Sequence, residues 1–175
     1  MDLGRAPRRG LLVCHTLELV ALAIWTGGLV VIMAAVIPAV FNSFGMEPGG
    51  RFLTRVFDGY NRVVAAAILV LVSAAAWRMW VHRGSGSAVS RPELALLLVM
   101  IMVAAAIGLV LGPESMRLQE QAFATQDEAA KKAALDAFFR THAVVRGLYV
   151  FNLGLGIALL AVKLQQWMRK EVSTT

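Results

Sequence analysis

Residues 94–111 read LALLLVMIMVAAAIGLVL, eighteen consecutive positions without a polar side chain. An α-helix of this length rises about 27 Å, close to the ~30 Å hydrocarbon core of a bilayer. A helix of a soluble bundle would carry a polar stripe along one side, and this stretch has none. The stretch therefore predicts a membrane-spanning helix.

Three more apolar runs accompany it. Residues 19–41 hold 23 positions without a formal charge, and residues 63–77 and 147–162 form shorter runs of 15 and 16. The Arg and Lys side chains flanking the shorter runs can extend towards the headgroups and complete the crossing. The chain is thus expected to be an all-α polytopic membrane protein, a four-transmembrane-helix bundle forming one domain over residues 1–175. The expected spans are about 11–41, 61–81, 94–111 and 143–163.

Two segments between the spans also have helical character. Residues 51–60 predict a short amphipathic helix lying at the membrane interface before the second span. Residues 114–141 predict a helical extension before the last span, with a helix from about Gln126 that runs into it. We expect the extension to be solvated.

Composition and charge narrow the class of protein. Hydrophobic residues make up 58% of the 175 residues and charged residues 16%, and the one cysteine excludes an internal disulfide framework. With four spans, the face that holds both termini carries nine cations against three acids, and the other face eight against seven. The cation counts are nearly equal, but net charge is +6 on the first face and +1 on the other, where five of the eight cations lie in a long acid-rich loop and orient the chain less. We therefore expect cytoplasmic termini in a multi-pass protein of a bacterial inner membrane. The net charge of +6 is then a topology signal, and the expected partner is the bilayer rather than nucleic acid.

Ionisable side chains inside spans are costly and mark candidate sites. The candidate intramembrane polar site comprises His15, Glu18, Trp25 and Lys163. The candidate polar cluster at the outer end comprises Asp58, Asn61, Arg62, His142, Arg146 and Asn152.

Depth in the membrane predicts which of these side chains meet. Glu18 shares a level with Lys163 and Arg78, and Arg146 shares one with Asp58 and Asn61. His15 and His142 lie at opposite ends of the bundle, which disfavours one haem between them. Two interpretations of the polar groups stay open: charge neutralisation that fixes the helices, or a substrate, proton or cofactor site.

Catalytic and metal chemistry have little support in the sequence. Cys14 and His15 are adjacent, so their side chains point about 100° apart on a helix and form no chelating pair. Met100 and Met102 lie on different faces, and membrane methionines are mostly packing residues. No nucleophile elbow, phosphate-binding loop or dinucleotide fingerprint is present. We therefore predict no catalytic residue, no metal site and no resident cofactor.

A set of short motifs extends over most of the chain. The motifs are His15, Trp25-Thr26-Gly27-Gly28, Pro38-Ala39-Val40-Phe41, Gly50-Arg51-Phe52-Leu53, Phe57, Phe139-Arg140-Thr141-His142 and Asn152. Together they resemble the transmembrane-protein-205-like family, also called domain of unknown function 4149. The resemblance implies a small four-helix membrane protein without an assigned biochemical activity. We accordingly expect an accessory subunit of a larger membrane complex, a homo-oligomer, or a small transport or stress-related factor.

The beginning of the chain is also similar to the membrane protoporphyrinogen oxidase of haem synthesis. That family has a histidine in its first helix, a Trp–Gly step and a Leu-Pro-Arg-Leu-Phe stretch followed by a second histidine. Here the corresponding run is Ile37-Pro38-Ala39-Val40-Phe41-Asn42, without the arginine or that histidine. A haem- or porphyrin-handling enzyme, with His15 and Glu18 near its site, is therefore the alternative.

Overall fold

The computed structural model of the protein describes residues 5–81 and 89–172. Of these residues 96% are helical, and none forms a strand. The elements in chain order are α1 (Arg5–Val31), η1 (Ile32–Val36), α2 (Ile37–Phe44), α3 (Met46–Val81), α4 (Arg91–Ala105), η2 (Ala106–Leu111), α5 (Gly112–Ala124) and α6 (Glu128–Val172).

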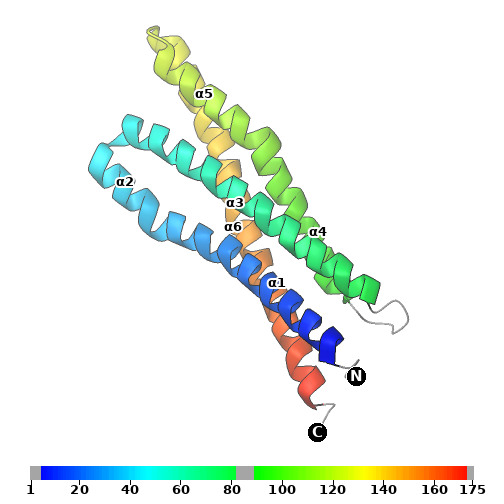
Figure 1. The fold of residues 1–175 in the computed structure, drawn as a ribbon. Coiled ribbons are helices and arrows are strands. Elements are labelled where there is room, and N and C mark those ends of the chain that lie inside the picture. The colour runs from blue at the N-terminus through cyan, green and yellow to red at the C-terminus, as the bar shows by residue number, and fades with distance from the viewer. Residues whose placement is uncertain (1–4, 82–88, 173–175) are drawn as a thin grey trace.

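These elements build four long rods. The segments α1–η1–α2 and α4–η2–α5 each form one rod, while α3 and α6 are uninterrupted helices. Each rod is long and apolar enough to cross a membrane. The start of α1 and the end of α6 lie at the same end of the bundle (Figure 1). The architecture is the predicted all-α, four-helix membrane bundle.

Prolines explain the two π-helical turns, η1 and η2. Pro38 and Pro113 lie in the first turn of α2 and α5, where each removes a backbone N–H from the rod. Just before each proline the hydrogen bonding widens: the Ile37 N–H donates to Ile32 O, and the Gly112 N–H donates to Ile107 O. Each rod therefore absorbs its proline in a π-turn and continues beyond it.

The second rod begins earlier than the sequence predicts. A turn at Gly45, whose φ of 73° favours glycine, reverses the chain after α2. From Met46 the helix α3 then runs unbroken to Val81, where a separate interfacial helix was expected at residues 51–60. The reason is packing, because Gly49 and the buried Leu53 place this part of α3 against α2.

The helical extension before the last span is confirmed. Residues 112–124 form α5, and α6 begins at Glu128 after Asp127, whose carboxylate accepts from the N–H groups of Ala129 and Ala130. The 45 residues of α6 rise about 67 Å, roughly twice the hydrocarbon thickness. The hairpin of α5 and α6 extends further from the termini than the turn between α2 and α3 (Figure 1).

The packing has a simple order. α1 packs on α3, α4 and α5 pack on α6, and α1 joins these two pairs through α6. The close approach of α1 and α6 depends on Gly156, because a Cβ there would overlap the Thr26 methyl group. Around it lies the core, which includes Leu22, Leu29 and Met100.

We predict that Gly156→Ala lowers the free energy of unfolding by about 1–3 kcal/mol, because the added methyl group forces α1 and α6 apart. Gly154→Ala is the matched control: its Cβ meets nothing within 4 Å, so it should leave stability unchanged or raise it by up to ~1 kcal/mol. Unfolding in mixed detergent micelles measures both variants. Adding Thr26→Ser, which removes the methyl group and keeps the hydroxyl, should restore the Gly156→Ala protein; failure to do so would contradict this packing.

Candidate functional site

Each of the four rods contributes one buried charge to a single cluster, the charge ring. Its members are Glu18 of α1, Arg78 of α3, Glu93 of α4 and Lys163 of α6. No side chain of the four is more than 8% exposed. Two carboxylates and two cations make the ring neutral as a whole.

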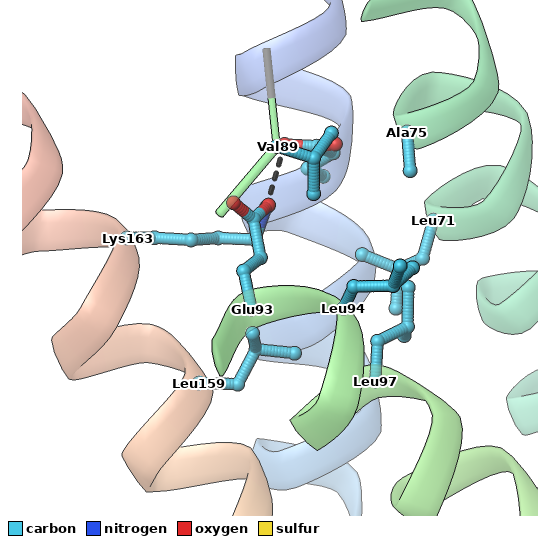
Figure 2. A pocket seen from close by; sticks show the side chains of 9 residues that line it. Leu71, Ala75, Val89, Glu93, Leu94, Leu97, Leu159 and Lys163 are labelled. Atoms are coloured by element: carbon cyan, nitrogen blue, oxygen red, sulfur yellow. Dashed lines mark hydrogen bonds and ion pairs between the residues drawn. The ribbon is translucent and has the colours of Figure 1, made fainter. Parts of the chain in front are cut away.

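The ring is closed by hydrogen-bonded ion pairs. Glu18 Oε2 accepts from Arg78 Nη1 at 2.8 Å and from Lys163 Nζ at 2.7 Å. Glu93 Oε1 accepts from Lys163 Nζ at 2.7 Å, and both Glu93 oxygens lie 3.0 Å from Arg78 Nη2. Figure 2 shows the Lys163 side chain reaching from α6 to the Glu93 carboxylate on α4. Each carboxylate thus binds both cations.

Local structure places Glu93 in the ring. Ser90 caps α4, and its hydroxyl oxygen accepts from the Glu93 N–H at 3.3 Å. Gln166 of α6 donates to the same oxygen at 2.8 Å and so ties this cap to the last helix. Pro92 in the first turn favours a helix start here. The Glu93 side chain therefore leaves the first turn of α4 in the direction of α6.

Burial makes the four charges interdependent. Removing a carboxylate or ammonium group from water costs several kcal/mol, which only close, well-bonded opposite charges offset. In hydrocarbon, unlike at a protein surface, a partner lost from such a set cannot be replaced by water. The ring therefore forms only when all four rods are assembled.

The space at the ring is small. The cavity that borders Glu18, Glu93 and Lys163 measures about 10 Å³, enough for one water molecule, and leucines such as Leu71 and Leu159 form its walls. A hollow of about 180 Å³ beside it is lined by Ser90, Pro92, Val162, Gln165 and Gln166. Small-molecule sites commonly need 300 Å³ or more. The geometry therefore suits charge pairing better than substrate binding.

The structure brings together part of the predicted intramembrane site. Lys163 binds Glu18 as depth predicts, and His15 Nδ1 lies 3.6 Å from Glu18 Oε2 at the edge of the ring. Trp25 lies elsewhere: two turns further along α1, its backbone carbonyl accepts from the buried Tyr60 hydroxyl at 2.7 Å. Seven residues of helix separate Trp25 from Glu18 by about 10 Å, so Trp25 is not part of the charge ring.

The predicted outer-end cluster is dispersed. Asp58 binds Arg62 one turn away at 2.7 Å, with both side chains exposed, and Asn61 accepts from Tyr149 at 3.0 Å. Arg146 is exposed and, within the described residues, forms no ion pair with Asp58, so the predicted pair is wrong. The exposed Asp58 meets the nearer cation on its own helix instead.

Of the remaining two members, His142 lies one helical turn from Arg146 on α6 and within its electrostatic reach, whereas Asn152 lies apart. His142 stacks on Phe138 with ring centroids 5.3 Å apart. Asn152 is buried in the middle of the bundle, where its amide donates to Met100 O at 3.4 Å. From Lys163 to His142 the helix α6 rises about 31 Å, so His142 and His15 lie at opposite ends and do not suit one haem.

Arg78 and Glu93 complete the ring, although neither was among the predicted site residues. Arg78 had been placed at the level of Glu18, but Glu93 had been counted as a loop acid. The sequence contains a feature that could have identified them. Arg78 and Glu93 are the charged residues that directly adjoin the apolar runs 63–77 and 94–111, at the same membrane face as Glu18 and Lys163. Two acids and two bases at one depth predict mutual pairing.

We predict that Glu18→Gln lowers the free energy of unfolding by about 3–5 kcal/mol, since it leaves one cation of the ring uncompensated. The double variant Glu18→Gln/Lys163→Met is neutral again, retains the Arg78–Glu93 pair, and should be more stable than Glu18→Gln alone. Detergent-induced unfolding measures the series. Asp58→Asn, which breaks an exposed pair, is the control and should cost under ~0.5 kcal/mol. If the changes in the free energy of unfolding caused by Glu18→Gln and by Lys163→Met simply added up in the double variant, Glu18 and Lys163 would not be energetically coupled, and the prediction would be contradicted.

Comparison with known proteins gives one match. A family model described as a domain of unknown function (DUF4149) matches residues 20–124. The matched stretch contains Arg78 and Glu93, while Glu18 and Lys163 lie outside it. No curated protein and no solved structure is significantly similar to the chain. The match covers more than half of the sequence, and the chain therefore belongs to the DUF4149 family.

Proposed function

We propose that this integral membrane protein is not an enzyme and serves as an accessory subunit of a larger membrane complex, or as a small transport or stress-related factor. We also assign it to the transmembrane-protein-205-like proteins, on the motifs that extend from His15 to Asn152. In this proposal the charge ring holds the four rods in one fixed arrangement. The outer surfaces of the rods are then available for lipid or for other subunits.

The closed ring carries the proposal. Both carboxylates bind both cations at 2.7–3.0 Å, so the strongest polar groups in the interior are engaged with one another. A catalytic site would need such a group directed at a substrate, together with room for that substrate. The adjoining cavity of about 10 Å³ holds one water molecule at most.

Orientation follows from charge in this proposal. The end with the termini, where the ring lies, faces the cytoplasm of a bacterial cell, because the cation excess is on that side. The α5–α6 hairpin then extends from the opposite face of the inner membrane. This hairpin and the lipid-facing sides of the rods are the surfaces offered to neighbouring subunits or to a second copy.

We predict that the protein, purified in mild detergent from its native membrane, shows no Soret band at one haem per chain. The reason is that His15 and His142 lie too far apart to share a haem. An absorption spectrum tests this directly. A stoichiometric Soret band that disappears in His15→Ala, while helical circular dichroism is retained, would overturn the proposal in favour of a haem- or porphyrin-handling enzyme.

A native gel of the same preparation separates the two non-enzymatic roles. An accessory subunit should migrate in a defined band well above the mass of the chain in its detergent micelle. A small independent factor should migrate as the chain alone or as a homo-oligomer.

A further inference from the structure

Three large apolar side chains gather at the turn between α2 and α3, the end of the bundle away from the termini. Phe44 is 56% exposed, Met46 71% and Phe52 47%, and the rings of Phe44 and Phe52 stack with centroids 5.9 Å apart. Groups of this size are seldom left in water without a use. We call these three residues the tip patch.

The tip patch continues the lipid-facing surface of α3. Phe52, Val63 and Val70 are separated by eleven and seven residues, which places them nearly in line on one side of the helix. Val63 and Val70 are exposed side chains of the membrane span, and the uncharged residues Val56 and Gly59 occupy the gap between Val63 and Phe52 on that side. The apolar stripe thus runs from the span to the tip without a charge.

A charged stripe runs beside it on the same helix. Its members, at intervals of three or four residues, are Glu47, Arg51, Arg55, Asp58 and Arg62. Two ion pairs lie within the stripe, Arg51–Glu47 at 3.2 Å and Arg62–Asp58 at 2.7 Å. An apolar side next to a charged side suits the part of a helix that passes through the membrane interface, where acyl chains and charged headgroups are both within reach.

Length agrees with this placement. From Leu19, next to the charge ring, to Phe44, where the rod ends before the Gly45 turn, the chain has 26 residues without a formal charge, a rise of about 39 Å. The hydrocarbon core accounts for ~30 Å, and the headgroup layers bring the bilayer to ~40–45 Å. One headgroup layer is thus about 5–7 Å thick, and the rod, at the average tilt of ~20°, spans about 37 Å of the bilayer thickness, which carries Phe44 into the layer opposite the ring.

The other turn at this end of the molecule differs. The α5–α6 hairpin extends further from the termini (Figure 1), and its turn reads Thr125-Gln126-Asp127-Glu128, all polar. The two turns are thus suited to different surroundings, water for α5–α6 and the membrane interface for α2–α3.

We propose that Phe44, Met46 and Phe52 form an interfacial anchor that inserts into the headgroup–acyl boundary of the leaflet facing away from the termini. Arg55 extends from the adjacent stripe towards the phosphates, while the aromatic pair rests on the acyl chains. The anchor sets the tilt of the α1–α2–α3 hairpin in the bilayer. It makes no use of the charge ring.

Spin labels on the full-length protein test the anchor. In a Cys14→Ser background, which removes the one cysteine, Met46→Cys and separately Phe52→Cys carry a nitroxide in phosphatidylcholine–phosphatidylglycerol vesicles. Collision rates with oxygen, which concentrates in lipid, and with a water-soluble nickel chelate report the surroundings. At both positions we expect oxygen collisions to exceed nickel collisions.

Two reference positions calibrate the measurement. Leu69→Cys lies on the exposed side of the α3 span and should be strongly oxygen-accessible, while Ala129→Cys next to the α5–α6 turn should be nickel-accessible. Circular dichroism checks that each labelled protein is folded. Dominant nickel access at residues 46 and 52 would overturn the anchor by placing the tip in water. Low access to both reagents would overturn it too, because it would indicate a protein contact at the tip.

Discussion

Four charges within a membrane bundle must cancel one another, and this requirement governs the arrangement of the helices. Glu18, Arg78, Glu93 and Lys163 each come from a different rod, and each pairs with both members of opposite sign. No two helices alone can satisfy the set, since a pair of rods supplies only two of its four charges. Specificity of assembly, rather than net stability, is the benefit expected of such buried ion pairs.

Along the bundle axis the interior changes from charged side chains at the ring to apolar side chains and then to single hydrogen bonds. Beyond the ring lie apolar side chains that are almost fully buried, among them Leu22, Leu71 and Met100. Further on, single hydrogen bonds join the rods, such as Tyr60 to the Trp25 carbonyl and Tyr149 to Asn61. These bonds are individually weaker than a charge ring, averaging ~0.6 kcal/mol in membrane proteins. The four rods are therefore coupled to one another most strongly at the end that contains the termini.

Much of the fold could be predicted from the sequence, because a polar-free run such as residues 94–111 has only one stable environment. The pair Glu18–Lys163 could also be predicted. Successive spans cross the membrane in opposite directions, so the position of a residue along its span tells near which membrane face it lies. The ion pairing at the outer end could not be predicted in this way. Asp58 is exposed and forms its ion pair with Arg62 on its own helix, and depth in the membrane does not distinguish Arg62 from Arg146 as a partner. Asn152 is separated from that cluster by helix rotation, which only the packing of α6 against α4 determines.

The short spans explain why the ring is buried at all. From Arg62 to Arg78 α3 rises about 24 Å, and from Arg146 to Lys163 α6 rises about 25 Å, less than the ~30 Å of hydrocarbon. Flanking cations were expected to extend to the headgroups at both ends. Arg62 and Arg146 are exposed and can extend towards the headgroups at one end, whereas Arg78 and Lys163 are buried within the bundle at the other end and bind Glu18 and Glu93 there. Glu18 and Glu93 provide there the counter-charge that water and phosphate provide for a cation at the surface. The ring thus compensates for two helices whose apolar segments are too short for the membrane that they cross.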